Sequence, residues 1–576
     1  MTTNRIERVD ELPIILAMLK NLCVQEIIDK HFFPHGNWTG LSYGQLAVLF
    51  ITYVLHSLTH RLCGMEPWLN QHKTVIQKIT GWKIGDKDAT DDRLGILTGG
   101  VGENEEKGYE FQQELNQHTI VAHELPTNTA RYDTTSYNVT HKIGSDENGI
   151  LRFGHTKNYR PDLLQFKQGL AVLDPAGFPI FSETLPGNMA DDPCYFPAWQ
   201  RIVKTLGKPD FLFIADSKAS SAETRSGINK GEGYYLFPLP MTGDTPKILR
   251  ELVLNPPQKP QPIELEPKTG QNDDKPRIVG TGFIVEKQME AKFADGTVYQ
   301  WDERWIVCDS HAHAYRQKKS LHDKLDKAVG QLDVLKPKSK DTADTFRAKA
   351  DSILKSHRVQ DYICLEVIET IELVKKYKGK GRPTQNTPYV MIEVRHLDLQ
   401  YALNEDAIEE YKKLAGWRIY VTNTTAEQMT LNQSAQYYRD EYLVERGFHR
   451  FKKGHIPVLP LFIRIPERIK GLMLLLTIAL QVLTLIEFVA RKELSKSNDS
   501  IAGLVLGNPK KKTKKPTAER LLSTFDNIHL LIEENRKNVK GVVVENLSAL
   551  QKKILSLLKL PESIFNISFY EKINST

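Results

Sequence analysis

The stretch ARYDTTSYNV, residues 130–139, alternates apolar and polar side chains and is rich in threonine and tyrosine, which predicts a β-strand. Two further strands are predicted at QFKQGLAVLD (165–174) and FPIFSETLPG (178–187), which the turn-forming residues DPAG connect. Residues 191–207 begin with two aspartates and end at a glycine, which predicts a helix. A short buried strand is predicted at DFLFIADS (210–217). Three strands, a helix and a fourth strand are the order of an α/β sheet.

Length and pattern divide the whole chain into five parts. With 576 residues, the chain is too long for one compact core. Amphipathic patterns predict a helical N-terminal domain over residues 1–125, with Ser42 as a helix N-cap. The α/β order occupies 126–230 and resumes at 416–492, and between them 231–415 predicts an inserted subdomain that contains strands. Residues 493–576 predict a basic linker and a helical tail.

A long apolar segment, GLMLLLTIALQVLTLIEFV (471–489), approaches the length of a membrane span. Gln481 and Glu487 interrupt it, and the remaining composition is that of a soluble protein, so we interpret it as a buried core helix and expect no membrane partner. The first thirteen residues lack the apolar core of a signal peptide. Five cysteines stand singly, which favours a reducing compartment without structural zinc.

The charge balance permits a nucleic-acid partner without requiring one. Lysine and arginine number 77 against 71 aspartates and glutamates, a formal net charge of +6. Two basic segments each have two interpretations. GKGRP (379–383) is either a DNA minor-groove contact or a flexible surface turn. NPKKKTKKPT (508–517) is either a phosphate contact or a solvated linker.

Three carboxylates fall at positions that suit a metal site. Asp133 lies within one predicted strand and Asp216 ends another, while Glu445 lies on a helix predicted over 430–454, after a strand at 417–424. Hard oxygen ligands of this kind suit Mg²⁺ or Mn²⁺. Two such ions about 3.5–4 Å apart can stabilise both the attacking and the leaving oxygen in phosphodiester cleavage.

The surroundings of Glu445 strengthen this interpretation. On one continuous helix, the same face carries Tyr438, Glu441, Tyr442, Glu445, Phe448, His449 and Lys452. If that face were only a buried aromatic stripe, Glu445 would lack a partner, which is unfavourable. A metal ion would supply the partner, and Lys452 would then point past it toward a bound phosphate.

These residues also carry a resemblance. The intervals between Tyr438, Glu441, Glu445 and Lys452 resemble the Tyr, Arg, Glu, Lys signature of the DDE transposases of bacterial insertion sequences, in the IS-four-like branch. Glu441 stands where that family has arginine. RYDTTS (131–136) and FIADSKA (213–219) resemble the family's strand-borne aspartates, and residues 154–192 are similar to the stretch between them. PERIKGLMLLLTIAL (466–480) and KKPTAERLL (514–522) fit the same family, so the resemblance covers nearly the whole chain.

The resemblance implies an α/β, RNase H-like catalytic core interrupted by a β-rich insertion, with a helical N-terminal domain that binds DNA ends and a helical C-terminal tail. It implies that Asp133, Asp216 and Glu445 hold two Mg²⁺ or Mn²⁺ ions, with Asp133 bridging them. The implied enzyme cuts double-stranded DNA at the terminal inverted repeats of its own element and joins the ends to target DNA. It would act as a homodimer on DNA in the bacterial cytoplasm, associated with the nucleoid. DNA contacts are expected from Tyr438, Lys452, Arg450, Lys453, His155, Lys157 and Arg160.

Two other functions remain open from the sequence. One is a catalytically inactive derivative that still binds element ends, which the acid at Glu441 allows. The other is a metal-free hydrolase with paired carboxylates, such as a glycosidase. That alternative predicts no salt-sensitive DNA binding, whereas phosphate contacts predict an affinity that falls steeply with salt. The basic residues around Glu445 argue against the hydrolase.

Overall fold

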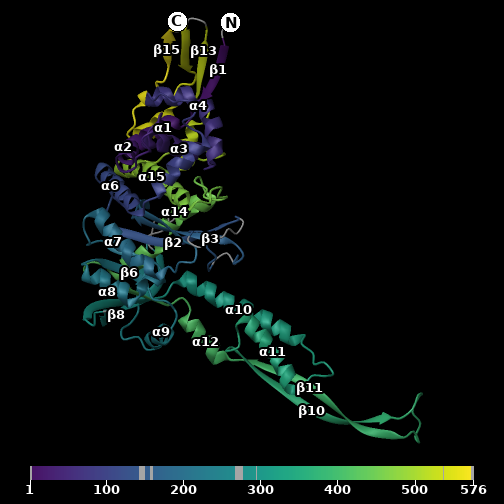
Figure 1. Ribbon diagram of the computed structural model, residues 1–576. Coiled ribbons are helices and arrows are strands. Elements are labelled where there is room, and N and C mark those ends of the chain that lie inside the picture. The colour runs from purple at the N-terminus through teal and green to yellow at the C-terminus, as the bar shows by residue number, and fades with distance from the viewer. Residues whose placement is uncertain are drawn as a thin grey trace.

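The computed structural model describes residues 3–141, 149–155, 160–265, 277–293, 295–535 and 538–572. The molecule is elongated (Figure 1). A small sheet next to both termini lies at one end, and helices and a large sheet form the body. An arm of helices and two long strands projects from the other end.

The body is built on a nine-stranded mixed sheet with the strand order β4-β3-β2-β5-β6-β12-β9-β8-β7. Its first three strands, β2 (Thr129–Val139), β3 (Leu164–Leu173) and β4 (Phe178–Pro186), form an antiparallel meander. β5 (Leu212–Ile214) runs parallel to β2, and β6 (Tyr234–Pro238) runs parallel to β5. With α7 (Tyr195–Leu206) after β4, the three strands, helix and fourth strand predicted between residues 130 and 217 are confirmed.

The second half of the sheet comes largely from the predicted insertion. β12 (Arg418–Thr422), the strand predicted at 417–424, pairs antiparallel with β6 and with β9 (Val298–Cys308). β8 (Arg277–Lys292) and β7 (Gln261–Leu265) continue the sheet beyond β9. The strands of 231–308 therefore widen the central sheet, whereas the sequence predicts a separate subdomain. Two helices, α8 (Ala222–Lys230) and α9 (Thr245–Leu254), lie between β5 and β7 in the chain.

Only the segment from α10 to α12 leaves the body, and it forms the arm. It consists of α10 (His311–Asp333), α11 (Ala343–His357), a two-stranded ribbon of β10 (Ile363–Tyr377) and β11 (Tyr389–Leu403), and α12 (Glu405–Leu414). Leu325, Leu354 and Ile408 are buried together at the base of the ribbon. The arm thus has a small hydrophobic core of its own.

The N-terminal domain is helical, as predicted, apart from its first strand. Its helices are α1 (Leu12–Asn21), α2 (Val24–His31), α3 (Tyr43–Ser57), α4 (Met65–Thr80), α5 (Asp91–Gly102) and α6 (Glu105–His123). The predicted N-cap at Ser42 is confirmed, because its hydroxyl accepts the Gln45 N–H at 3.1 Å and Gln45 bonds back to the Ser42 N–H.

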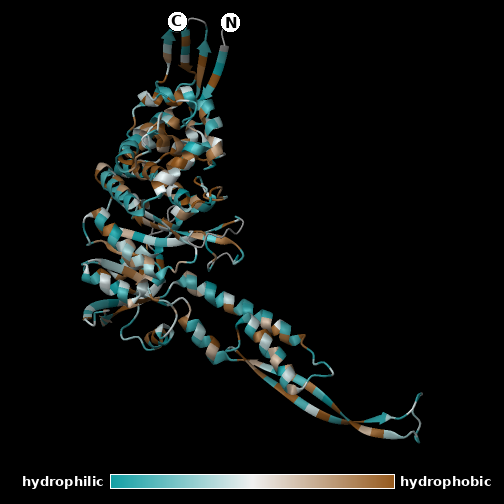
Figure 2. Cartoon of the chain, viewed as in Figure 1, coloured by the Kyte–Doolittle hydropathy of each residue, from teal (hydrophilic) through white to brown (hydrophobic). Residues whose placement is uncertain are grey.

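The apolar segment 471–489 lies within α15 (Pro466–Lys496), which is a buried core helix. Protein atoms bury 94% of its most apolar eighteen-residue window. The amide nitrogen of Gln481 is satisfied within the core, since it donates to Asn116 Oδ1 and to the Pro179 carbonyl, both at 2.9 Å. Figure 2 shows the apolar residues concentrated in this helical layer and in the sheet beneath it.

The C-terminal part is not the purely helical tail that the sequence predicts. It has two short helices, α16 (Ala518–Leu522) and α17 (Ala549–Leu557), and three strands, β13 (His529–Glu534), β14 (Asn538–Val543) and β15 (Phe569–Lys572). These strands form a sheet with β1 (Thr3–Arg8), in the order β1-β13-β14-β15. The helical prediction fails because β13 finds its partner at the other end of the chain, beyond the reach of local sequence patterns.

α5 and α15 cross so closely that their backbones touch. A Cβ atom added to Gly471 would lie 1.9 Å from the Thr98 carbonyl oxygen, and one added to Gly102 would lie 2.0 Å from the Glu467 carbonyl oxygen. Glycine at both positions therefore sets the distance between the N-terminal helices and the core helix.

We expect Gly471→Ala to lower stability by about 1–3 kcal/mol, because the added methyl group must push two backbones apart. The melting temperature, followed by scanning fluorimetry, measures this. Gly330→Ala in α10 is the matched control, since its Cβ would meet open space and it gains the same helix propensity. An unchanged melting temperature for Gly471→Ala would contradict the close crossing.

Candidate functional site

Asp133 and Asp216 come together on neighbouring parallel strands. β2 and β5 pair with Arg131 opposite Ile214, and each aspartate follows two residues later at the same level of the sheet. Both aspartates line one small cavity, which the first turn of the helix α14 (Tyr442–Lys453) and the residue before it close. The structure thus brings together two of the three predicted metal ligands.

The Asp216 carboxylate is held in place by two donors. Asp216 caps a short 3-10 turn (Ser217–Ser220), where its Oδ1 accepts the Lys218 N–H at 2.9 Å. The Tyr195 hydroxyl, from α7, donates to the same oxygen at 2.5 Å. Burial and the neighbouring Asp216 raise the pKa of Tyr195 far above its ordinary value, so the hydroxyl keeps its proton and orients the carboxylate.

The helix predicted over 430–454 is broken into two. α13 (Leu431–Arg439) begins with a capping box between Thr430 and Gln433 and is followed by a turn at Asp440 and Glu441. In that turn the Asp440 N–H bonds to the Gln436 carbonyl, and the Gln436 side chain bonds to the Asp440 carboxylate at 3.0 Å. The common face predicted from Tyr438 to Lys452 is therefore wrong, because Tyr438 lies on a different helix from Glu445.

The break places Glu441 on the cavity with Asp133 and Asp216. Burial raises the pKa of Glu441, and the nearby charge of Glu445 raises it further, while the Tyr438 hydroxyl lowers it. The sequence assigned Glu441 no role. Glu441 and Glu445 are one helical turn apart in the sequence, and this spacing indicates that the two carboxylates lie on the same side.

Glu445 itself is exposed to solvent beside Glu441. Its predicted enclosure by aromatic side chains is wrong, since Tyr442 is 47% exposed and Phe448 turns into the core. Four carboxylates therefore gather here, three around the cavity and Glu445 at its solvent side.

Three of the predicted DNA-contacting residues lie near the cavity, Lys452 and Lys453 on α14 and Tyr438 on α13. Lys452 turns back to β2, where its ammonium group donates to Thr135 Oγ1 and lies 5.6 Å from the centroid of the Tyr137 ring. Lys453 is exposed at the end of α14. Tyr438 packs against Tyr420, with ring centroids 4.5 Å apart, and is half-buried. Lys452 thus contacts a residue that lies two positions along β2 from Asp133.

His155 and Arg160, the two candidates between 155 and 160 that the structure describes, are not part of the cavity lining. Arg160 is exposed and donates twice to the Asp162 carboxylate, at 2.8 and 2.7 Å. His155 is exposed, and Lys157 lies outside the described residues.

Arg450 differs most from its predicted role. It is 5% exposed and donates to Glu519 Oε1 at 2.8 Å and to Glu487 Oε1 at 2.5 Å. Arg446 and Arg491 also pair with Glu487. The prediction that Arg450 contacts DNA is wrong, because its guanidinium group points into the core, where it neutralises a carboxylate of α15.

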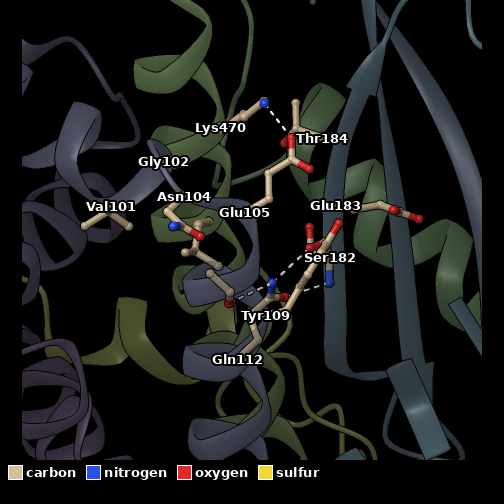
Figure 3. Close-up of a pocket in the computed structure, with 12 residues that line it drawn as sticks. Val101, Gly102, Asn104, Glu105, Tyr109, Gln112, Ser182, Glu183, Thr184 and Lys470 are labelled. Atoms are coloured by element: carbon tan, nitrogen blue, oxygen red, sulfur yellow. Dashed lines mark hydrogen bonds and ion pairs between the residues drawn. The ribbon is translucent and has the colours of Figure 1, made fainter. Parts of the chain in front are cut away.

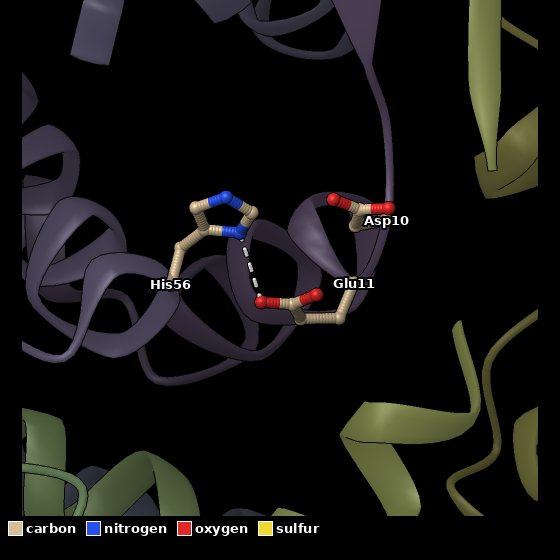
Figure 4. Close-up of side chains that lie close together, drawn as sticks. All are labelled: Asp10, Glu11 and His56. Atoms are coloured by element: carbon tan, nitrogen blue, oxygen red, sulfur yellow. Dashed lines mark hydrogen bonds and ion pairs between the residues drawn. The ribbon is translucent and has the colours of Figure 1, made fainter. Parts of the chain in front are cut away.

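A second group of metal-ligand side chains lies far from this cavity (Figure 4). Within the described part of the chain, only Asp10, Glu11 and His56 form a set of three or more such residues whose ligand atoms all lie within 4.8 Å of one another. His56 Nδ1 bonds to Glu11 Oε1 at 2.9 Å. Asp10 pairs with Arg8 at 2.6 Å and accepts the Asn527 N–H at 2.8 Å. These contacts explain the group as an ion-pair network that joins the first helix to the C-terminal part.

A larger cavity lies between α6, β4 and α15 (Figure 3). Gln112 exchanges hydrogen bonds with the backbone of Ser182 across it, and Lys470 pairs with Glu105 at 2.5 Å. Glu183 is partly buried at its edge and accepts a hydrogen bond from Tyr132, and desolvation of its carboxyl group raises the pKa of Glu183 to about 7. None of the predicted site residues lines this cavity, so we interpret it as a packing gap.

Comparison with known proteins leaves the family open. No protein-family model matches the chain, and no curated protein matches its sequence. A solved structure, the cryo-EM structure of a piggyBac transposase synaptic complex with hairpin DNA, is similar over 89% of this chain and 80% of that chain, with a TM-score of 0.37 and 9% sequence identity. A likeness at this level carries no assignment of function.

We expect Arg450→Ala to lower stability by about 3 kcal/mol or more, because it removes two buried ion pairs and leaves Glu487 less neutralised. The melting temperature measures the loss. Lys453→Ala, which removes an exposed cation from the same helical turn, should leave the melting temperature unchanged. Equal behaviour of the two variants would contradict the structural role of Arg450.

We also expect Glu183→Gln to raise the melting temperature by an amount that depends on pH. The folded-state pKa of Glu183 is raised, so the wild-type protein loses stability as the pH rises from about 4.5 to 7, by about 3 kcal/mol in total. Glutamine removes this loss, so the variant's advantage in melting temperature should grow across that window. Glu106→Gln is the control, since a hydrogen bond from Arg201 lowers the pKa of Glu106, so its effect should be constant across this window and should shrink only as the pH falls below about 4.5. A pH-independent difference for Glu183→Gln would contradict the raised pKa.

Proposed function

We propose that this protein is a DNA transposase that cuts DNA at terminal inverted repeats and joins the ends to target DNA by divalent-metal-dependent phosphodiester chemistry. The observation that carries the proposal is the convergence of Asp133 and Asp216 with the acidic start of α14 at one cavity. These residues come from three segments far apart in the chain, and they are the segments whose motifs resemble the DDE transposases.

The topology around the cavity supports an RNase H-like core. The order β4-β3-β2-β5-β6, an antiparallel meander followed by two parallel strands, is that of an RNase H-like sheet. Asp133 lies on the central strand of this unit and Asp216 follows the next one. β7, β8 and β9 then correspond to the expected β-rich insertion between the second aspartate and Glu445.

The donor set fits a hard divalent cation. Asp133, Asp216 and Glu445 offer carboxylate oxygens, which Mg²⁺ and Mn²⁺ prefer. Glu441 adds a half-buried carboxylate, and its pKa is raised by burial and by the nearby charge of Glu445. Two bound ions would activate the attacking oxygen and stabilise the leaving one.

The chain's own residues would orient the ligands and the DNA. Tyr195 and the Lys218 N–H fix one oxygen of Asp216. Lys452 and Lys453 place positive charge at the end of α14, near β2, where a DNA phosphate could approach the acids. We further propose that two copies act together, because two DNA ends must be joined.

We expect Asp133→Asn, Asp216→Asn and Glu445→Gln each to lower strand transfer by more than about 100-fold, the scale of losing one electrostatic stabiliser of a transition state. The substrate is DNA that carries the inverted repeats flanking the coding region, with Mg²⁺. Glu441→Gln should stay within about tenfold of wild type, a change of about 1.4 kcal/mol. Loss on Glu441→Gln with retention on Glu445→Gln would move the third ligand to Glu441.

Two controls separate catalysis from binding. Glu251→Gln, an exposed acid on α9, should leave strand transfer unchanged. Gel shifts of the wild-type protein on the same DNA should weaken steeply with salt. DNA binding without any cleavage by the wild-type protein would support an inactive end-binding derivative, and salt-insensitive binding would contradict both.

A further inference from the structure

The distal half of the β10–β11 ribbon is an apolar surface without a partner among the residues that the structure describes. The base of the ribbon packs on α10 and α11 through Ile363, Leu365 and Leu399. Beyond the base, the two strands pair only with each other and extend away from the body (Figure 1). A two-stranded ribbon alone is marginally stable in water.

Large apolar side chains cover this distal half, as the brown segments in Figure 2 show. Leu373 is 62% exposed and Ile371 is 54% exposed, on strand β10. Val390, Met391 and Ile392 are exposed on the facing strand β11. By the strand register, Ile371, Leu373 and Met391 lie on one face of the ribbon and Val390 and Ile392 on the other. Exposed apolar side chains on both faces mark surfaces that another molecule covers.

Charge is divided along the ribbon into an acidic stem and a basic tip. We define the tip as residues 373–392, which contain five lysines and arginines and no acid. The stem comprises 363–372 and 393–403, and it contains five acids and one arginine. The stem acids are Glu366, Glu369, Glu372, Glu393 and Asp398.

We propose that this ribbon pairs antiparallel with the same ribbon of a second copy of the chain. In a two-fold symmetric pair, the basic tip of each copy lies on the acidic stem of the other. The same arrangement covers the apolar side chains of both tips, and the outer edges of β10 and β11 offer unpaired backbone groups for pairing across the interface. A DNA partner would match the positive charge of the tip, but it would not match the acidic stem and would not cover the aliphatic side chains. The inference does not depend on the chemistry proposed above.

A charge-swap experiment on the full chain, without DNA, tests the pairing. The tip variant is Lys375→Glu with Lys376→Glu, and the stem variant is Glu366→Lys with Glu372→Lys. All four side chains are exposed, so folding should survive, which circular dichroism and the melting temperature check. Sedimentation velocity over a concentration series measures self-association.

We expect wild-type dimers, and at least tenfold weaker self-association of each variant alone, because the formal charge falls from +5 to +1 on the tip of one variant and from −4 to 0 on the stem of the other. A mixture of the two variants should form a heterodimer, since the unchanged basic tip of the stem variant faces the unchanged acidic stem of the tip variant at one end of the pair.

Two results would overturn the proposal. One is a wild-type chain that stays monomeric across the micromolar range, or a dimer that neither swap weakens. The other is a tip swap that weakens DNA binding in a gel shift while self-association stays unchanged, which would make the ribbon a nucleic-acid contact. Cleavage by the acids of α14 can fail or succeed independently of both results.

Discussion

The buried carboxylate of Glu487 is the interaction on which the position of the candidate site depends. It is 1% exposed, and it pairs with Arg446 and Arg450 of α14 and with Arg491 of its own helix. It also accepts the Ala518 N–H from the C-terminal part. A buried charge is tolerated only when it is paired and hydrogen-bonded. This one carboxylate therefore ties α14, which carries Glu445 and directly follows Glu441, to the core helix.

The core helix α15 in turn fixes the position of α14 relative to the rest of the body. α15 touches α5 backbone to backbone at Gly471 and Gly102, and Gln481 joins it to α6 and β4. On its other side α14 is held against the sheet, since a Cβ added to Gly447 would meet Leu170 at 2.9 Å and Leu480 at 3.4 Å. The acids thus stand on rigid elements, which suits a site whose geometry must not relax under electrostatic repulsion.

Local sequence patterns correctly predicted the structural features that depend on interactions between residues close together in the chain. The strands around Asp133 and Asp216 follow from alternation, and the capping boxes at Ser42 and Thr430 follow from hydrogen bonds between residues three apart. Three features depended on distant partners and were missed. Arg450 is buried because it forms ion pairs with Glu487 and Glu519. β13 is a strand because β1 pairs with it. β7 to β9 join the main sheet because β9 pairs with β12. The break at Asp440 was missed because the helical period continues through it.

The pairing of β1 with β13 gives the chain an order of assembly. β1 leaves the ribosome long before its hydrogen-bonding partner, His529–Glu534, is synthesised. Domains generally fold as units during synthesis, but this sheet cannot form until β13 has been made. The pairing of β1 with β13 then joins the N-terminal helices to the C-terminal part, and Asp10 stabilises the same junction by accepting a hydrogen bond from the Asn527 N–H. A fragment that stops before β13 leaves an unpaired strand edge, a site for association with other chains.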